Sequence, residues 1–403
     1  TNLDEISQIQ INIMKTNPNV VFYINDAYTD ASKFLNIFPK MITYTPVEGS
    51  EIPRHMVQNL NKVAENGKAI AQCEYGYHEM LKAGINVHSY IYHGYNPNIF
   101  YPIDDNNKSI DTESKYCYFK TEQGKANIDP KLLYDHSCQN CVKSDIKEQI
   151  ECLFYKEETI TLCKYNNDTT QWIQIEDVPI SKLRDSINPS KKFMFLFVGA
   201  NHMIRKKIER LLKAYTLIIK QSKQLEDRIH LHLHTNPISP TGIDLLEITN
   251  RFNIQNNISF SFGNWSENAL NILYSIADCQ VSATSSEGFS LPVLEGFATG
   301  LPMIAPDCTS QTELIDNVIE DHTNPNKTIG PRGLLATIKD NYMIQDLTYR
   351  YLVDEYDLAE KMKQIFQDKK MREKYGENAI KFSREYTWSK ICDQWDSLLK
   401  EIK

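Results

Sequence analysis

The stretch that decides the fold runs from Val281 to Pro306 and reads VSATSSEGFSLPVLEGFATGLPMIAP. It predicts a helix that begins near Leu291. Pro292 suits the first helical turn, because its fixed φ is already helical and its missing N–H is not needed there. Gly300 suits the left-handed residue that follows a helix, and the proline two residues later prevents the helix from resuming. The stretch therefore reads as a strand, a loop and a short buried helix.

Two carboxylates flank the predicted start of this helix. Glu287 lies in the loop before it, and Glu295 lies about one turn inside it. The free N–H groups of Ser290 and Leu291 and the positive end of the helix dipole favour phosphate oxygens. The carboxylates cannot bind phosphate, but they can accept hydrogen bonds from sugar hydroxyls on either side of it. This pattern is typical of a nucleotide-diphosphate sugar site, and the alternative is an ordinary loop and helix with two solvated glutamates.

Residues 285–307 carry a family resemblance. They resemble the E-x7-E signature of retaining glycosyltransferases with the GT-B fold, in the large family 4, or group 1, set. The chain departs from the signature at Ser290, where the family has Gly, and at Gly296 and Phe297, where it has Ala and Met. The resemblance implies an α/β protein with two Rossmann-like domains that face a cleft. It also implies that a sugar passes from a UDP- or GDP-sugar to a glycan, lipid or protein acceptor with retention of configuration.

The resemblance also implies which residues form the site. Arg205 and Lys206 take the place of the family's basic pair at the donor diphosphate. A guanidinium can bind phosphate oxygens in pairs, and an ammonium adds a mobile charge. Glu295 would hold the ribose and Glu287 the donor sugar. The other residues expected to bind the donor are Gly199, Asn236, Asn264, Trp265, Gly288, Phe289, Ser290 and Leu291. No metal or other cofactor is expected, since fixed cations and a helix start can stabilise the departing charge.

The chain divides into three predicted regions. Residues 1–102 alternate strands with helices and read as an acceptor-side Rossmann-like domain, on which residues 388–403 are expected to pack back. Residues 191–387 read as the donor-binding Rossmann-like domain. Residues 103–190 read as an inserted accessory segment at the domain crossing, with a predicted hairpin over 159–175. Such an insertion would serve acceptor recognition or self-association.

The first domain reads as incomplete when compared with the family. An early strand and a Gly-rich loop near the amino terminus have no counterpart, so either a piece ahead of Thr1 is missing or the acceptor domain is reduced. The family's acceptor-side histidine has no counterpart either. Glu48 is the best polar group at that position and is expected to join Glu287, Arg205 and Lys206 as a catalytic residue. His55 and His78 are weaker candidates, because each also reads as an exposed or capping histidine.

Two groups of residues suggest metal sites and have plainer explanations. Cys138 and Cys141, near His136, could hold zinc, but a single C-x2-C pair is a weak signal and free thiols in a reducing compartment are favoured. The run IHLHLHT over 229–235 places three histidines on one face of a strand. A packed sheet face under a helix is favoured over a metal cluster there.

Composition excludes some classes of protein. The chain has 403 residues and a net charge of −8, so it lacks the basic balance of a general nucleic-acid-binding protein. No run approaches the roughly 20 apolar residues of a membrane span. The expected location is the cytoplasm, with peripheral membrane association as an alternative. Two rival functions stay open: a noncatalytic subunit that binds a sugar nucleotide, and a GT-B-fold epimerase that acts on the sugar nucleotide itself.

Overall fold

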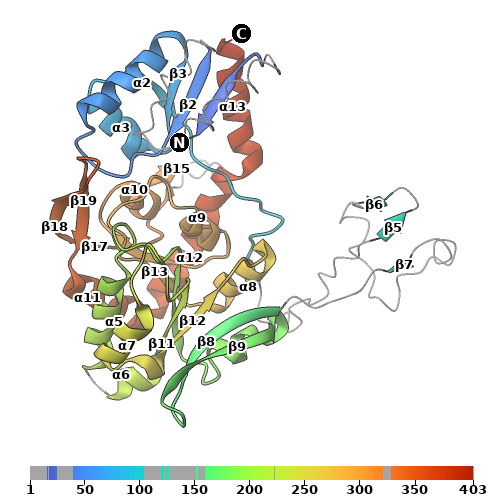
Figure 1. The fold of residues 1–403 in the computed structure, drawn as a ribbon, viewed down its shortest axis with the longest axis vertical. Helices are drawn as coiled ribbons and strands as arrows, with labels where there is room; N and C mark the ends of the chain where they lie inside the picture. The colour runs from blue at the N-terminus through green and yellow to red at the C-terminus, as the bar shows by residue number, and fades with distance from the viewer. Residues whose placement is uncertain are drawn as a thin grey trace.

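The computed structural model describes Thr16 and residues 18–24, 40–103, 119–121, 124–126, 151–152, 159–221, 223–320 and 328–402. These residues form two α/β units, one above the other in Figure 1. The zinc alternative at Cys138 and Cys141 lies outside the described residues, as does most of the range 103–158.

The first unit is built on a parallel sheet of four strands in the order β1-β2-β3-β4. The alternation of strands with helices that was predicted for this region is present. The central strand β2 is buried along its whole length, as a parallel strand covered on both faces should be. The elements are β1 (Val21–Ile24), β2 (Met41–Thr45), α2 (Arg54–Asn66), β3 (Lys68–Ala71), α3 (Glu74–Lys82) and β4 (Val87–Tyr90).

The second unit is built on an eight-stranded sheet in the order β17-β14-β13-β10-β11-β12-β8-β9. Its first six strands are parallel, and β10 pairs with β13 on one side and β11 on the other. The chain order reverses at β10, and ligands in such sheets bind outside the carboxyl ends of the strands at this point. The strands are β10 (Phe193–Val198), β11 (Ile229–His234), β12 (Ile258–Phe262), β13 (Cys279–Val281), β14 (Met303–Pro306) and β17 (Gly333–Ala336).

The predicted hairpin is present, but it belongs to the second sheet. β8 (Thr159–Asn166) and β9 (Gln171–Pro179) are antiparallel, and β8 continues the sheet by pairing with β12. The hairpin and the following α4 (Leu183–Ile187) bury apolar side chains in the core of that domain. This part of 103–190 is therefore an edge of the second sheet rather than a separate module.

Helices cover both faces of the second sheet. One face packs against α5 (Ile208–Ile219), α6 (Lys223–Arg228), α7 (Leu245–Phe252) and α11 (Glu355–Gln367). The other face packs against α8 (Glu267–Ile276), α9 (Leu291–Ala298) and α12 (Lys369–Ser383). The prediction for α9 is confirmed, since it begins at Leu291 and Gly300 has a φ of +83°.

Of the remaining elements, the last helix joins the two units and the others are short or lie near the boundary between them. The last helix α13 (Trp388–Ile402) returns to the first sheet, where the ring of Trp395 lies 5.1 Å from that of Tyr44. Near the cleft lie α10 (Ser310–Asp316) and the antiparallel pair β18 (Ile338–Met343) and β19 (Tyr349–Val353). Short strands occur at β5 (Phe119–Thr121), β6 (Gly124–Ala126), β7 (Glu151–Cys152), β15 (Ile319–Glu320) and β16 (Thr328–Ile329). Among the helices described, none is long and apolar enough to span a bilayer.

Candidate active site

The loop after β10 carries the predicted phosphate-binding cations. It runs from Gly199 to Lys207, whose left-handed φ of +48° turns the chain into α5. Arg205 and Lys206 therefore lie just before a helix, where the dipole disfavours positive charge unless an anion is close. The structure supplies anions for both.

Lys206 pairs with the first glutamate of the signature. Its Nζ lies 2.5 Å from Oε1 of Glu287, and the two residues are 8% and 5% exposed. The hydroxyl of Thr284 donates a second hydrogen bond to the same carboxylate oxygen, at 3.0 Å. A buried charge pair with an extra hydrogen bond holds both side chains in one geometry. The loops after β10 and β13 are thereby joined at the point where the strand order reverses.

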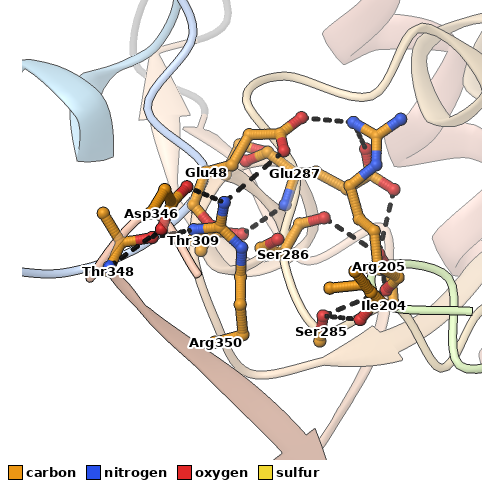
Figure 2. A network of polar contacts seen from close by, with 12 residues as sticks. Glu48, Ile204, Arg205, Ser285, Ser286, Glu287, Thr309, Asp346, Thr348 and Arg350 are labelled. Atoms are coloured by element: carbon orange, nitrogen blue, oxygen red, sulfur yellow. Dashed lines mark hydrogen bonds and ion pairs between the residues drawn. The ribbon is translucent and has the colours of Figure 1, made fainter. Parts of the chain in front are cut away.

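Arg205 connects the two domains. Its guanidinium donates to the carboxylate of Glu48, in the loop after β2, and lies 3.8 Å from Glu287. The four predicted catalytic residues, Glu48, Arg205, Lys206 and Glu287, thus meet in one cluster. Figure 2 shows Glu48, Arg205 and Glu287 pointing toward one another. Two cations and two anions converge on the edge of the cleft.

A second arginine, which the sequence did not indicate, holds the Glu48 loop. Arg350 on β19 is 4% exposed and donates to the backbone oxygen of Glu48 at 2.6 Å (Figure 2). It also donates to the hydroxyl of Thr348 at 2.9 Å and pairs with Asp346 at 3.4 Å. No motif or spacing links this hairpin to Glu48, so only the tertiary structure reveals the contact.

Hydroxyl groups at the start of α10 orient the Glu287 loop. Thr309 accepts a hydrogen bond from the backbone N–H of Glu287 at 3.0 Å. Ser310 donates to the backbone oxygens of Glu287 and Phe289, at 3.1 and 3.0 Å. The direction of the Glu287 side chain is therefore set from both its neighbours in the loop and a helix beyond it. The signature does not indicate either hydroxyl, because both follow a different strand, β14.

Of the predicted donor residues around the start of α9, Ser290 and Leu291 lie at the helix start, whereas Gly288 and Phe289 lie against the first domain. Ser290 has a φ of +82°, in the region that favours glycine, and Leu291 is 40% exposed at the helix start. A Cβ at Gly288 would lie 2.6 Å from the Cβ of Pro46 in the first domain. The side chain of Phe289, which was expected at the donor, is 3% exposed and packs against Tyr92 and His93 instead. The Phe289 ring is therefore part of the packing between the domains.

Glu295 lies on α9, as predicted, and has a neighbour of its own. The hydroxyl of Tyr274 on α8 donates to its carboxylate at 2.8 Å. Burial raises the pKa of Glu295, and the hydrogen bond from Tyr274 opposes that shift. One carboxylate oxygen is thus held in place.

The remaining predicted donor residues follow the ends of β11 and β12. Asn236 and Asn264 are exposed, and the ring of Trp265 lies 4.5 Å from that of His234. They lie at the carboxyl ends of β11 and β12, and β11 is next to the strand β10 that precedes the charged cluster.

The histidines considered for the acceptor side do not enter the cluster. His55 is exposed, and the exposed side chain of His78 lies 3.7 Å from Glu74. His93 is half-buried, and its partial burial lowers its pKa to about 4. Its ring contacts Tyr44, Phe289 and Trp388, so it is part of the packing between the domains.

A cavity of about 820 Å³ opens between the domains beside this cluster. Its lining includes Thr309, which binds the Glu287 backbone, and the carboxylates of Glu74 and Glu313. Glu313 accepts hydrogen bonds from the hydroxyl of Tyr92 and from the first N–H groups of α3, and burial raises its pKa. The cavity is therefore walled by both domains.

These features define a protein of the GT-B class, and the fold predicted from the sequence is confirmed by solved structures. Sucrose-phosphate synthase from Thermosynechococcus elongatus matches 98% of this chain and 77% of its own, with a TM-score of 0.61 and 15% identity. HepE from Anabaena, crystallised with UDP and glucose, matches 100% of this chain and 83% of its own, with a TM-score of 0.60 and 12% identity.

Sequence comparison adds matches for part of the second domain. Residues 192–340 match the family model described as glycosyl transferases group 1. An uncharacterized glycosyltransferase of Methanocaldococcus jannaschii is 27% identical over 162 residues. The match covers 39% of this chain and 38% of that relative's length.

Proposed function

We propose that this chain is a family 4-type retaining glycosyltransferase that moves a hexosyl group from a UDP- or GDP-sugar to a hydroxyl of a glycan, lipid or protein. The observation that carries the proposal is the meeting of Arg205, Lys206 and Glu287 beside the start of α9, where the strand order reverses. The match of residues 192–340 to group 1 glycosyl transferases supports the same chemistry. The shared fold with HepE, crystallised with UDP-glucose, supports this type of donor.

The charges of the cluster suit the departure of a nucleoside diphosphate. The bond between the anomeric carbon and the phosphate oxygen breaks, and the diphosphate gains negative charge as it leaves. Arg205 and Lys206, with the amides of Ser290 and Leu291, would stabilise that charge from fixed positions. In this structure both cations pair with carboxylates, and a diphosphate would compete for the same hydrogen-bond donors.

The transfer balances without a further reactant. The acceptor hydroxyl oxygen bonds to the anomeric carbon on the face from which the diphosphate departs, so the configuration is retained. The hydroxyl proton passes to the departing phosphate oxygen. Glu287 would accept hydrogen bonds from the donor sugar, and Glu295 would accept them from the ribose. Glu48 would face the acceptor, since it reaches the cluster from the first domain.

We place the acceptor in the cavity of about 820 Å³ between the domains. That cavity borders Thr309, one hydrogen bond from Glu287. Its lining of carboxylates and tyrosines can bind hydroxyl groups and stack on sugar rings.

The test is an incubation of the purified chain with a panel of UDP- and GDP-sugars, with and without a mixed glycan and lipid extract. Release of nucleotide that requires the extract, with an axial product bond read by NMR from an axial donor, would support the proposal. Glu287→Gln serves as the matched inactive control. Donor binding without turnover would indicate a noncatalytic subunit, and conversion of the sugar without an acceptor would indicate an epimerase.

A further inference from the structure

A continuous row of side-chain hydrogen bonds runs along β11 and β12 in the second sheet. It runs through His230, Ser259, His232, Ser261 and His234, here called the His-Ser row. Its four links measure 2.8, 2.8, 2.9 and 2.8 Å between ring nitrogens and hydroxyl oxygens. Each serine hydroxyl bridges two histidines. The row reaches from the amino end of β11 to its carboxyl end.

Strand geometry explains the row. The parallel register of β11 and β12 sets His232 beside Ser259 and His234 beside Ser261, and the two-residue period puts all five side chains on one face. That face is buried, with His232 and Ser261 at 0% exposure. Polar groups in such a place must bond to one another. The interpretation of this run as a packed sheet face is thereby confirmed.

The three rings are neutral at physiological pH. Burial is the main reason that the pKa of His230 falls to about 3 and that of His234 to about 4, and burial also holds the pKa of His232 well below its ordinary value. A neutral ring has one N–H and one lone pair. His232 bonds to a serine through each of its nitrogens, so it donates to one and accepts from the other.

The row therefore has a direction. Each hydroxyl has one proton, which it donates to one histidine while it accepts from the other. The whole row points either toward His234 or toward His230, and a reversal at any link would leave two protons or two lone pairs facing each other. In the first setting His234 accepts at Nδ1 and has its proton on Nε2. In the second, Nε2 of His234 presents a lone pair.

Positive charge at one end favours the first setting. The ammonium groups of Lys164 and Lys192 lie near enough to His230 to contribute to its lowered pKa, whereas burial alone acts on His234. Lys164 stands opposite Ser259 in the pairing of β8 with β12, which puts it on the same face. Cations favour lone pairs on the groups nearest to them and protons pointing away.

The far end of the row lies at the donor side. The backbone oxygen of His234 accepts a hydrogen bond from Gly199 at 3.2 Å, where the loop with Arg205 and Lys206 begins. The His234 ring is partly exposed, and its Nε2 makes no hydrogen bond to the described residues. Nearby, Thr235 Oγ1 and Trp265 Nε1 are buried without a partner among those residues. Unsatisfied polar groups at the end of two strands indicate that a ligand group completes them.

We propose that the His-Ser row holds His234 in the tautomer with its proton on Nε2, and that this N–H binds a carbonyl oxygen of the donor's nucleobase. The inference rests on the proposed function, since it takes the diphosphate to lie at Arg205 and Lys206. A base that extends from there over the end of β11 reaches His234. Uracil and guanine have a carbonyl group to offer, and adenine has none. The row thus selects UDP or GDP against ADP.

The tautomer can be measured directly. With ¹⁵N-labelled histidine, two-bond couplings in the NMR spectrum show which ring nitrogen has the proton, and His234→Gln assigns the signal. The wild-type chain should show the proton on Nε2 of His234. Ser261→Ala removes the hydroxyl that donates to Nδ1, so both tautomers should become populated. Ser261→Thr retains a hydroxyl and should restore the original tautomer. Ser275→Ala is the matched control, since that hydroxyl on α8 has no partner among the described residues.

Nucleotide affinity supplies the second readout, by calorimetry with UDP, GDP and ADP. The wild-type chain should bind ADP at least tenfold more weakly than UDP or GDP. Ser261→Ala should weaken UDP by up to about tenfold, the value of one hydrogen bond, and leave ADP unchanged. Ser259→Ala, farther from the ligand, should act in the same direction, and it replaces Ser261→Ala if that variant does not fold.

The results distinguish three claims: the role of the row, base selection and the proposed function. A proton on Nδ1 of His234, or a tautomer that Ser261→Ala and Ser259→Ala leave unaltered, overturns the role of the row. Equal affinity for UDP, GDP and ADP with the expected tautomer overturns base selection but leaves the proposed function standing. If none of the three nucleotides binds, the proposed function itself fails, and base selection fails with it.

Discussion

Replacing Lys206 by methionine should destabilise the second domain as well as abolish transfer. The substitution retains the length of the apolar stem and removes the ammonium group, so Glu287 is left as a buried charge with 5% exposure. Breaking a buried ion pair costs roughly 3–5 kcal/mol. Glu287 retains the hydrogen bond from Thr284 and a guanidinium at 3.8 Å, so the lower end, about 3 kcal/mol, is expected. For a domain of this size that corresponds to a fall in Tm of about 6–12 °C.

Two matched variants separate the causes. Arg205→Met removes the neighbouring cation, whose side chain is 33% exposed and whose partner Glu48 also lies 3.9 Å from Arg350. A more exposed pair contributes little, so a loss of about 1 kcal/mol or less is expected. Lys206→Met combined with Glu287→Gln removes both buried charges and should restore stability to within about 1 kcal/mol of wild type, although transfer stays absent.

Calorimetric melting and donor titration of the four proteins would decide the matter. The expected order of Tm is wild type and the double variant highest, Arg205→Met slightly below, and Lys206→Met lowest. If Lys206→Met has the same Tm as Arg205→Met, the pair of Lys206 and Glu287 is solvated and the burial argument fails. If the double variant is as unstable as Lys206→Met alone, the loss comes from packing rather than from an unpaired carboxylate.

Three further predictions follow from single residues. Ser290→Gly should melt higher than Ser290→Ala by the equivalent of about 1 kcal/mol, because φ is +82° there, and equal melting would contradict this. Burial raises the pKa of Glu295, so its carboxyl stabilises the fold only at low pH and that stabilisation is lost as the pH rises through the raised pKa. Glu295→Gln should therefore melt higher than wild type at pH 7, with no advantage below about pH 4, and bind donor more weakly. Arg350→Met should cost about 2–3 kcal/mol and weaken acceptor use, while Arg350→Lys restores part of both; unchanged kinetics would show that Arg350 does not position Glu48.

The parts of the site that could be predicted are local in sequence. Pro292 and Gly300 specify where α9 begins and ends, whatever lies around them. Ser266 caps α8 in an equally local way, because a serine before a helix accepts a hydrogen bond from within its first turn. Contacts between residues of one loop or one turn depend on the local backbone conformation, so the sequence pattern alone indicates them.

The contacts between domains could not be predicted in the same way. The sequence offered Glu48 only as the best polar group in place of a missing histidine, yet its partners are Arg205, in the loop after β10, and Arg350, on β19. Phe289 sits in the signature, but its ring packs against Tyr92 and His93 of the first domain. Which side of a loop meets the other domain depends on how the domains pack, and no periodicity encodes that.

The hairpin β8–β9 shows the same limit in a strand. Alternation predicted the strands correctly, but it could not assign their sheet. Leu162 and Cys163 are adjacent and therefore point to opposite faces, and they are 0% and 6% exposed. A strand buried on both faces must lie within a layered domain, and Leu162 and Cys163 join the cores on the two sides of the second sheet. β12 supplies the two serines of the His-Ser row and pairs with β8 along its other edge, so the hairpin brings Lys164 to the face that bears the row. The residues of 103–190 from Thr159 onward are therefore part of the second sheet and its core, and not of a separate module.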